Sequence, residues 1–209
     1  MQKQPNLFDF TYDATQFNSS PTTLIAGADE AGRGPLAGPV CASVVVLPPD
    51  FPFEILNDSK KLSEKKRLFA EPIIKEKSLA WAIAWSTPKE IDQINILQAS
   101  LLAMKRAYLL VQQQLAKSGK HIDLLLVDGN KTPSVDIPCQ AIVKGDSKVH
   151  EIMAASILAK TARDRFMLAA AKRWPAYGFD RHKGYPSLAH KAALRANGPC
   201  PIHRLSFKY

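Results

Sequence analysis

The chain has 209 residues, of which 46% are hydrophobic, which is enough for one globular domain with a full core. Its 28 Lys and Arg outnumber its 19 Asp and Glu, and the formal net charge of +9 favours a polyanionic partner such as nucleic acid. The three cysteines are far apart and form no Cys-x-x-Cys pair, which argues against a zinc site and a disulfide framework and predicts a reducing, cytoplasmic location.

Residues 1–22 predict a flexible polar arm, because prolines interrupt them and they show no sustained periodicity. Their start lacks the basic-then-apolar layout of a secretory signal peptide. No apolar stretch of the chain approaches the roughly 18 residues that a membrane span needs. We therefore expect one domain over residues 23–209, preceded by this arm.

The first strand is predicted over residues 24–28, an apolar run that ends at the adjacent acids Asp29 and Glu30. A loop of glycines and prolines, residues 32–39, leads to a valine-rich strand over residues 40–47. That connection has no room for a crossover helix, so the two strands should be antiparallel neighbours. Adjacent carboxylates suit a hard cation such as Mg²⁺ or Mn²⁺, and the glycines leave the main chain open to a ligand.

Helices and strands then alternate. A loop over residues 57–63 leads into a helix that Pro72 is expected to kink or end, and a third strand over residues 79–86 is apolar on both faces, so both should be covered. Thr87-Pro88-Lys89-Glu90 is a capping box that begins a long amphipathic helix, and Ser118-Gly119 ends it.

Two more strands are predicted over residues 122–127 and 137–143. From Ser147 the pattern is helical to about Lys172, and shorter helices fill the remainder. Strands followed by and interspersed with helices indicate a mixed sheet in an α/β layer fold.

Asp128 follows a buried strand, as Asp29 does, and ligand sites in open α/β sheets gather at the carboxyl ends of strands. Asp146 stands at a predicted helix start, over the inward stripe of the helix, where a carboxylate needs a partner. The alternatives are a simple turn for Asp128 and a helix cap for Asp146. Taken together, Asp29, Glu30, Asp128 and Asp146 suit a two-metal phosphoryl-transfer site. No nucleophilic Ser or Cys with an adjacent His is visible, which disfavours a covalent hydrolase.

His182-Lys183-Gly184-Tyr185-Pro186 is a further motif that suggests contact with nucleic acid. Tyr185 offers a flat ring for stacking on a sugar or base, flanked by positive charge. The alternative is a turn tyrosine half-buried against the core. The five histidines are scattered, and none pairs with another at ligand spacing.

With these residues in place, the chain resembles the bacterial type 2 ribonucleases H, the ribonuclease HII family. The matching motifs span residues 24 to about 207. In chain order they are Asp29-Glu30-Ala31-Gly32-Arg33-Gly34, Asn57-Asp58-Ser59-Lys60-Lys61-Leu62-Ser63, Val127-Asp128-Gly129-Asn130, Lys144-Gly145-Asp146-Ser147, Ala154-Ala155-Ser156-Ile157-Leu158-Ala159-Lys160, Arg163-Asp164-Arg165 and His182-Lys183-Gly184-Tyr185-Pro186.

The resemblance implies an RNase H-like fold, a five-stranded mixed sheet flanked by helices with a helical C-terminal portion. It implies cleavage of RNA hybridised to DNA and nicking 5′ of a single ribonucleotide in DNA, which begins ribonucleotide removal and leaves 5′-phosphate and 3′-hydroxyl ends. It also implies two Mg²⁺ or Mn²⁺ ions, bound with substrate by the four acids named above.

The resemblance further implies that Gly32, Arg33 and Gly34 contact the 2′-hydroxyl and the neighbouring phosphate, and that Tyr185 lies at the RNA–DNA junction. Reading a 2′-hydroxyl is what tells RNA from DNA, and bare glycine backbone can reach it where a side chain would obstruct. Three lysines are candidate phosphate contacts, namely Lys60, Lys144 and Lys183.

Two rival functions stay open at this point. One is another nuclease on the same fold, such as a junction resolvase or integrase-like enzyme, and the other is a non-catalytic nucleic-acid-binding module whose acids merely cap strands. Within the arm, Gln4-Pro5-Asn6-Leu7-Phe8 resembles the peptides by which bacterial repair proteins dock on the sliding clamp, although an ordinary tail is the alternative. We expect a monomer.

Overall fold

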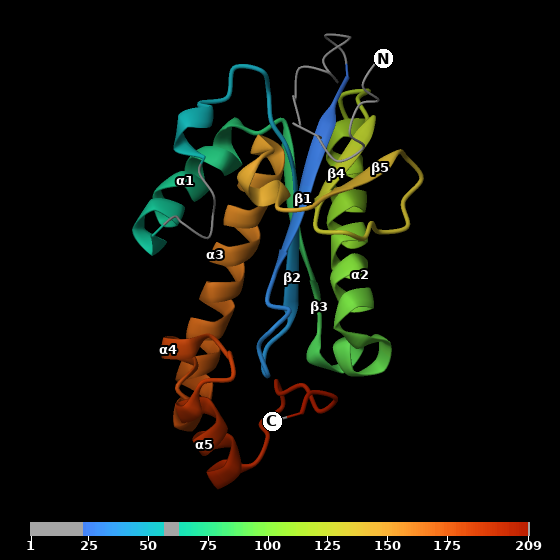
Figure 1. Cartoon of the computed structure of the whole chain (residues 1–209). Helices are drawn as coiled ribbons and strands as arrows, with labels where there is room; N and C mark the ends of the chain where they lie inside the picture. The colour runs from blue at the N-terminus through green and yellow to red at the C-terminus, as the bar shows by residue number, and fades with distance from the viewer. Residues whose placement is uncertain (1–22, 57–62, 209) are drawn as a thin grey trace, which may run out of the picture.

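The computed structural model describes residues 23–56 and 63–208. Within them lies a five-stranded sheet of order β3-β2-β1-β4-β5. Helices cover both faces of this sheet, α1 and α3 on one side and α2 on the other (Figure 1). The predictions for Lys60 and for residues 4–8 concern parts of the chain outside the described residues.

The strands are β1 Ile25–Ala31, β2 Val40–Val46, β3 Ala80–Ser86, β4 Leu124–Asp128 and β5 Cys139–Ile142. The α-helices are α1 Glu64–Lys77, α2 Pro88–Ala116, α3 His150–Arg173, α4 Phe179–His182 and α5 Leu188–Asn197. Short 3-10 turns are η2 Phe53–Ile55, η3 Gly145–Ser147 and η4 Pro175–Tyr177.

β1 is the central strand, and it pairs antiparallel with β2 and parallel with β4. The antiparallel pairing of the first two strands is therefore confirmed. β1 extends further than predicted, because its pairing with β2 continues to the Ala31–Cys41 pair. As a result Asp29 and Glu30 lie inside the strand rather than beyond its end.

Both faces of the sheet are covered, as the doubly apolar strands predict. The alanine side of β3 is buried in one core cluster with α2, where Met104 and Tyr108 are nearly inaccessible. On the other face Val45 packs with α1 and α3, and Trp81 and Ile83 lie partly buried against them. The sheet is thus held between two apolar layers, and its strand ends are left for polar residues.

α2 begins with the predicted capping box. Thr87 Oγ1 accepts a hydrogen bond from Glu90 N, and the Glu90 carboxylate accepts one from Thr87 N. The helix is kinked at Asn95, where φ is +65° and the side chain caps Gln98 N. Ile94, next to the kink, is 37% exposed. By length and composition α2 could cross a membrane, a test that core helices also pass, and here it packs on β2 and β3.

Two helix predictions need correction. Pro72 lies inside α1 without ending it, and the helix runs from its Ser63 cap to Lys77 as one element. α3 begins at His150 rather than Ser147, because Val149 has an extended backbone and residues 145–147 form a separate 3-10 turn. Asp146 therefore lies in this turn ahead of α3 rather than at the start of the helix, and its 2% exposure confirms the predicted inward placement.

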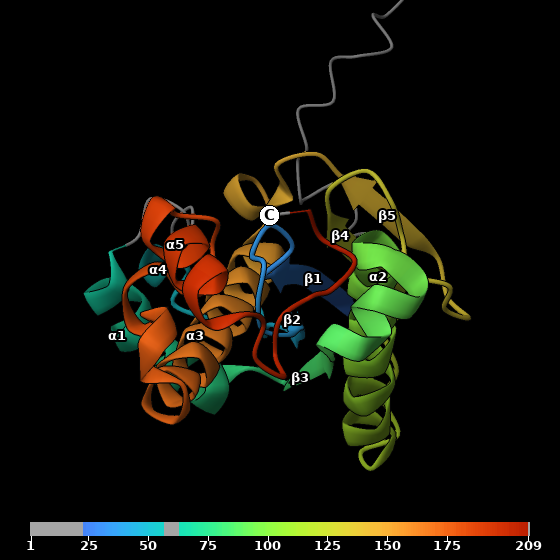
Figure 2. The same ribbon diagram turned by 90° about the horizontal axis from the view of Figure 1, so that it is seen from below.

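The C-terminal portion is helical, as expected, and then returns to the sheet. After α5, residues 198–208, here called the return segment, run beside residues 32–39, and Ala37 and His203 form an isolated β-bridge (Figure 2). Asp92 of α2 fixes the far end of this return segment by accepting hydrogen bonds from Leu205 N and Ser206 N. The return segment thereby becomes a neighbour of the loop between β1 and β2.

Candidate active site

Asp29 and Asp128 lie side by side at the carboxyl ends of neighbouring parallel strands. The last pair in the β1–β4 register is Ala28 with Val127, so the next residue of each strand is an aspartate. This placement is the usual one for a ligand site in an α/β sheet, and it confirms the proximity predicted from the two strand patterns.

Asp146 reaches the same place through a tight turn. Gly145 N donates a hydrogen bond to Asp128 Oδ1 at 2.7 Å, so the Asp128 carboxylate holds the turn that carries Asp146. A Cβ at Gly145 would lie 2.6 Å from Ile152 Cδ1, so the end of the Ile152 side chain would have to move to make room for it. Carboxylate oxygens of Asp29, Asp128 and Asp146 all lie within 4.8 Å of one another.

Glu30 stands apart from that group of three. Successive residues of a strand point to opposite faces, so Glu30 and Asp29 diverge although they are adjacent. The Glu30 carboxylate accepts a hydrogen bond from Arg33 Nη1 at 3.4 Å, and Glu30 lines the same cavity as Asp29 and Asp128. The structure therefore gathers three of the four predicted acids and places the fourth beside them.

Asp29 is in an environment unfavourable to a lone negative charge. It is 4% exposed, and burial raises the pKa of its carboxyl well above the ordinary value, with further increases from the charges of Glu30 and Asp128. A hydrogen bond with Ser156 opposes this rise in pKa. A divalent cation would relieve the same repulsion, and a donor set made only of carboxylate oxygens suits Mg²⁺ or Mn²⁺.

A cavity of about 390 Å³ opens over these acids. One side of it is acidic and the other carries cations and glycine backbone. The residues that line it are Asp29, Glu30, Ala31, Gly32, Arg33, Gly34, Arg67, Asp128, Ser156, Lys160, Arg163 and Tyr185.

Residues 32–39, the glycine loop, lie at the rim of the cavity and are held by two buried arginines, Arg163 and Arg204. The Arg204 guanidinium donates to the carbonyls of Gly32, Arg33, Pro35 and Gly38. The Arg163 guanidinium donates to the carbonyls of Ala37, Pro39 and Lys183. Gly32 has φ of +101°, and a Cβ there would lie 2.0 Å from Arg163 Nε, so only glycine fits. The sequence analysis missed Arg204, because nothing local links it to a loop about 170 residues away.

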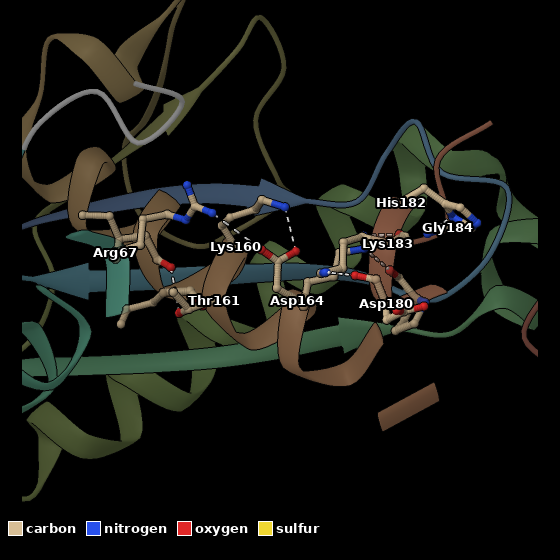
Figure 3. A network of polar contacts seen from close by, with 12 residues as sticks. Arg67, Lys160, Thr161, Asp164, Asp180, His182, Lys183 and Gly184 are labelled. Atoms are coloured by element: carbon tan, nitrogen blue, oxygen red, sulfur yellow. Dashed lines mark hydrogen bonds and ion pairs between the residues drawn. The ribbon is translucent and has the colours of Figure 1, made fainter. Parts of the chain in front are cut away.

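Two cations in the cavity were also missed, Arg67 of α1 and Lys160 of α3. Figure 3 shows both beside Asp164, where Lys160 Nζ donates to Asp164 Oδ1 at 2.6 Å and Arg67 Nη2 lies 3.7 Å from Asp164 Oδ2. Ser156, Lys160 and Arg163 follow one another at spacings of four and three along α3, which is the signal that places them on one helix face.

Two of the predicted lysines, Lys144 and Lys183, lie further out. Lys144 is exposed, with a left-handed backbone (φ +58°), and Lys183 Nζ donates to the carbonyl of Asp180 (Figure 3). Neither is among the residues that line the cavity.

Tyr185 lies at the rim of the cavity and is 45% exposed. Its ring faces Gly34, since a Cβ on Gly34 would meet Tyr185 Cε1 at 3.5 Å. The tyrosine and the glycine loop therefore form one continuous edge beside the acids.

Solved structures similar to this chain define its class. The chain resembles Archaeoglobus fulgidus RNase HII, solved as a PCNA:RNase HII complex, with a TM-score of 0.68 and 22% identity over 89% of this chain and 96% of that one. It resembles Bst-RNase HIII in complex with Mn²⁺ with a TM-score of 0.72 and 17% identity over 89% and 67% of the two chains. The chain thus has the RNase H-like fold that its sequence motifs imply.

The sequence identifies the family within that class. The Ribonuclease HII family model matches residues 26–209. The Ribonuclease HII of Dechloromonas aromatica (strain RCB) is 58% identical over 187 residues, which cover 90% of this chain and 92% of that protein. The chain belongs to the ribonuclease HII family, whose members are hydrolases that act as endoribonucleases.

Proposed function

We propose that this enzyme cuts the RNA strand of RNA–DNA hybrids and nicks DNA on the 5′ side of a single embedded ribonucleotide, leaving 5′-phosphate and 3′-hydroxyl ends. The observation that carries the proposal is the grouping of Asp29, Asp128 and Asp146 within 4.8 Å, next to a cavity edged by the glycine loop and Tyr185. A net charge of +9 favours approach of the polyanionic duplex. Cleavage 5′ of the ribonucleotide would begin its removal from DNA.

The four acids Asp29, Glu30, Asp128 and Asp146 would hold Mg²⁺ or Mn²⁺, with two ions when substrate is bound. Such a pair supplies an activated water and stabilises the leaving oxygen. The raised pKa of Asp29 supports this assignment, because the carboxylate needs a cation close by to stay ionised in its buried position. The Mn²⁺ bound to the similar Bst-RNase HIII agrees with it.

Recognition of the ribonucleotide would rest on the edge that the glycine loop and Tyr185 form beside the acids. Arg204 engages the carbonyls of Gly32 and Arg33, so the N–H groups of residues 32–34 are the main-chain groups available to a sugar hydroxyl and a phosphate. Tyr185 would stack on the sugar or base at the junction. Arg67 and Lys160 line the cavity and would contact phosphates. Three predicted lysines would do the same, namely Lys144 and Lys183 outside the cavity lining and Lys60, which lies outside the described residues.

A cleavage assay tests the proposal directly. Two duplexes of the same sequence are compared, one with a single ribonucleotide and one all-DNA, each with Mg²⁺, with Mn²⁺ or with excess EDTA. We expect one nick 5′ of the ribonucleotide, no cleavage of the all-DNA duplex, loss of cleavage in EDTA and recovery when the metal is restored. Cleavage of both duplexes would favour the rival nucleases, and binding without cleavage would favour the non-catalytic module.

We also propose that residues 4–8 dock on the bacterial sliding clamp. A glutamine anchor followed by an apolar pair suits a pocket, and an archaeal family member is known in complex with PCNA. The double variant Leu7→Ala, Phe8→Ala should lose clamp binding in surface plasmon resonance and should cut a free duplex at the wild-type rate. Unchanged clamp affinity would identify the segment as an ordinary tail.

We further propose that residues 23–209 act as one catalytic domain, as a monomer, in the cytoplasm. All three cysteines are free, which accords with a reducing compartment.

A further inference from the structure

Three of the scattered histidines meet beneath Tyr185. His190 of α5 and His203 of the return segment are 0% and 3% exposed, and their Nε2 atoms lie 3.1 Å apart. The ring of His182 stacks on that of His190 with centroids 4.5 Å apart and an interplanar angle of 16°. The proposed chemistry of the cavity uses none of these rings.

The hydrogen-bond partners assign the protons on two of these rings. His190 Nδ1 lies 2.9 Å from the carbonyl oxygen of Tyr185, which can only accept, so this nitrogen carries hydrogen. His203 Nδ1 has two backbone neighbours in Cys200: the N–H donates to it at 2.9 Å, and the carbonyl oxygen, which already accepts from His203 N, lies further away at 3.3 Å. The shorter contact makes Nδ1 the acceptor and places the hydrogen of His203 on Nε2. His203 Nε2–H then donates to the bare Nε2 of His190. The result is a directed chain from Cys200 N–H through both imidazoles to the carbonyl of Tyr185.

This chain of hydrogen bonds requires both imidazole rings to be neutral. A second proton on His190 would place two N–H groups head to head, and a second proton on His203 would oppose Cys200 N–H. Burial favours neutrality, since it lowers the pKa of His190 and lowers that of His203 to about 4, with His190 adding to the second effect. Burial also lowers the pKa of His182. Other ionisable groups also face these rings among the described residues, namely Tyr177, Cys200, Asp180, Arg181 and Lys183.

This chain of hydrogen bonds ends at the backbone carbonyl of Tyr185. The carbonyl of Tyr185 accepts from His190 and also from Ser187 N at 2.8 Å, while Tyr185 N donates to the carbonyl of His182 at 2.9 Å. His203 is followed directly by Arg204, whose guanidinium holds the carbonyls of the glycine loop. One short segment therefore supports both the glycine loop and Tyr185.

We propose that His190 and His203 are positioning residues for Tyr185, and that their neutral imidazole chain fixes the Tyr185 main chain so that its ring faces the glycine loop. The inference rests on the proposed role of Tyr185 at the ribonucleotide junction. It assigns no contact between the histidines and the substrate, so their effect passes through Tyr185.

Two substitutions of His190 separate its two nitrogens. Asparagine places its amide N–H where Nδ1 lies and can still donate to the carbonyl of Tyr185, whereas glutamine reaches the position of Nε2 and leaves that carbonyl without its donor. With the single-ribonucleotide duplex, His190→Gln should lower kcat/KM by about tenfold, and His190→Asn should stay within about threefold of wild type. Equal losses in both variants, or no loss in His190→Gln, would overturn the inference.

A double-mutant cycle adds a result that a purely structural role would not produce. In a Tyr185→Ala background, His190→Gln should cause no further loss of kcat/KM, because the residue that it positions is gone. A multiplied loss would overturn the inference. If the wild-type enzyme nicks the duplex but these variants do not give the expected results, only the positioning role is contradicted. If the wild-type enzyme does not cut the duplex, the proposed function is contradicted, and this inference with it.

A measurement on the unmodified protein covers the case in which a variant does not fold. Long-range ¹⁵N–¹H NMR correlations at pH 7 should show His190 as the neutral Nδ1–H tautomer and His203 as the neutral Nε2–H tautomer. The opposite tautomer of either ring, or a protonated ring, would overturn the inference.

Discussion

The substitution Asp128→Asn is expected to lower cleavage of the single-ribonucleotide duplex by ~1,000-fold or more and to leave duplex binding within about threefold of wild type. An amide oxygen carries no formal charge and is a far weaker ligand than a carboxylate for a hard dication. It can still accept the hydrogen bond that Gly145 N donates at 2.7 Å, so the turn carrying Asp146 should stay in place. The loss should therefore reflect chemistry rather than misfolding.

Single-turnover cleavage in Mg²⁺ and duplex binding in EDTA measure the two effects separately. Asp136→Asn is the matched control, because it removes the same charge from an exposed residue that keeps its hydrogen bond from Tyr108 Oη. The control should cut at the wild-type rate. An active Asp128→Asn enzyme would contradict the role given to this acid.

The same variant has an expected effect on stability. The charge of Asp128 helps to raise the pKa of Asp29, so the folded state holds an ionised Asp29 less readily than the unfolded state does. At pH 7 this repulsion lowers the free energy of unfolding of the metal-free protein, and removing it should leave Tm in EDTA unchanged or higher. Mg²⁺ should raise the Tm of wild type more than that of the variant, because a ligand that binds the folded state more tightly stabilises it more at the same concentration.

The substitution Gly27→Ala is expected to lower the free energy of unfolding by about 3 kcal/mol or more. A Cβ on Gly27 would lie 2.2 Å from the main-chain carbon of Glu151 and 2.3 Å from Ile152 N. These are backbone atoms in the first turn of α3, so no side chain can turn aside, and the helix would have to lift from β1. Since β1 also carries Asp29, cleavage should fall together with stability.

Urea denaturation followed by circular dichroism measures the change. Gly119→Ala is a suitable control, because a Cβ there meets nothing within 4 Å and the variant bears only the cost of its positive φ, about 1 kcal/mol. A Gly27→Ala protein as stable as this control would show that α3 can shift on the sheet without penalty.

Much of the fold follows from local signals in the sequence. Alternating or continuous apolar runs predict all five strands, and Thr87 with Glu90 predicts the start of α2, because such patterns depend on a few adjacent residues. Boundaries shift where tertiary pairing decides them. β1 runs on through Asp29 and Glu30 because β2 supplies partners, and α2 turns at Asn95 although the apolar spacing continues.

The sequence by itself also predicted that these acids lie near one another, because carboxylates at the ends of buried strands are costly without a partner. It could not determine how they meet. Asp146 arrives through a turn held by Asp128, and Glu30 diverges from Asp29 because a strand alternates its faces.

Only the tertiary structure decided what supports the rim of the cavity. Arg204 lies about 170 residues from the loop whose carbonyls it holds, and His190 and His203 meet although no spacing in the sequence pairs them. Local sequence patterns reflect the contacts that a residue makes with its neighbours along the chain. The contacts of a buried guanidinium or imidazole depend instead on which distant backbone groups the packing of helices and strands brings within hydrogen-bonding distance.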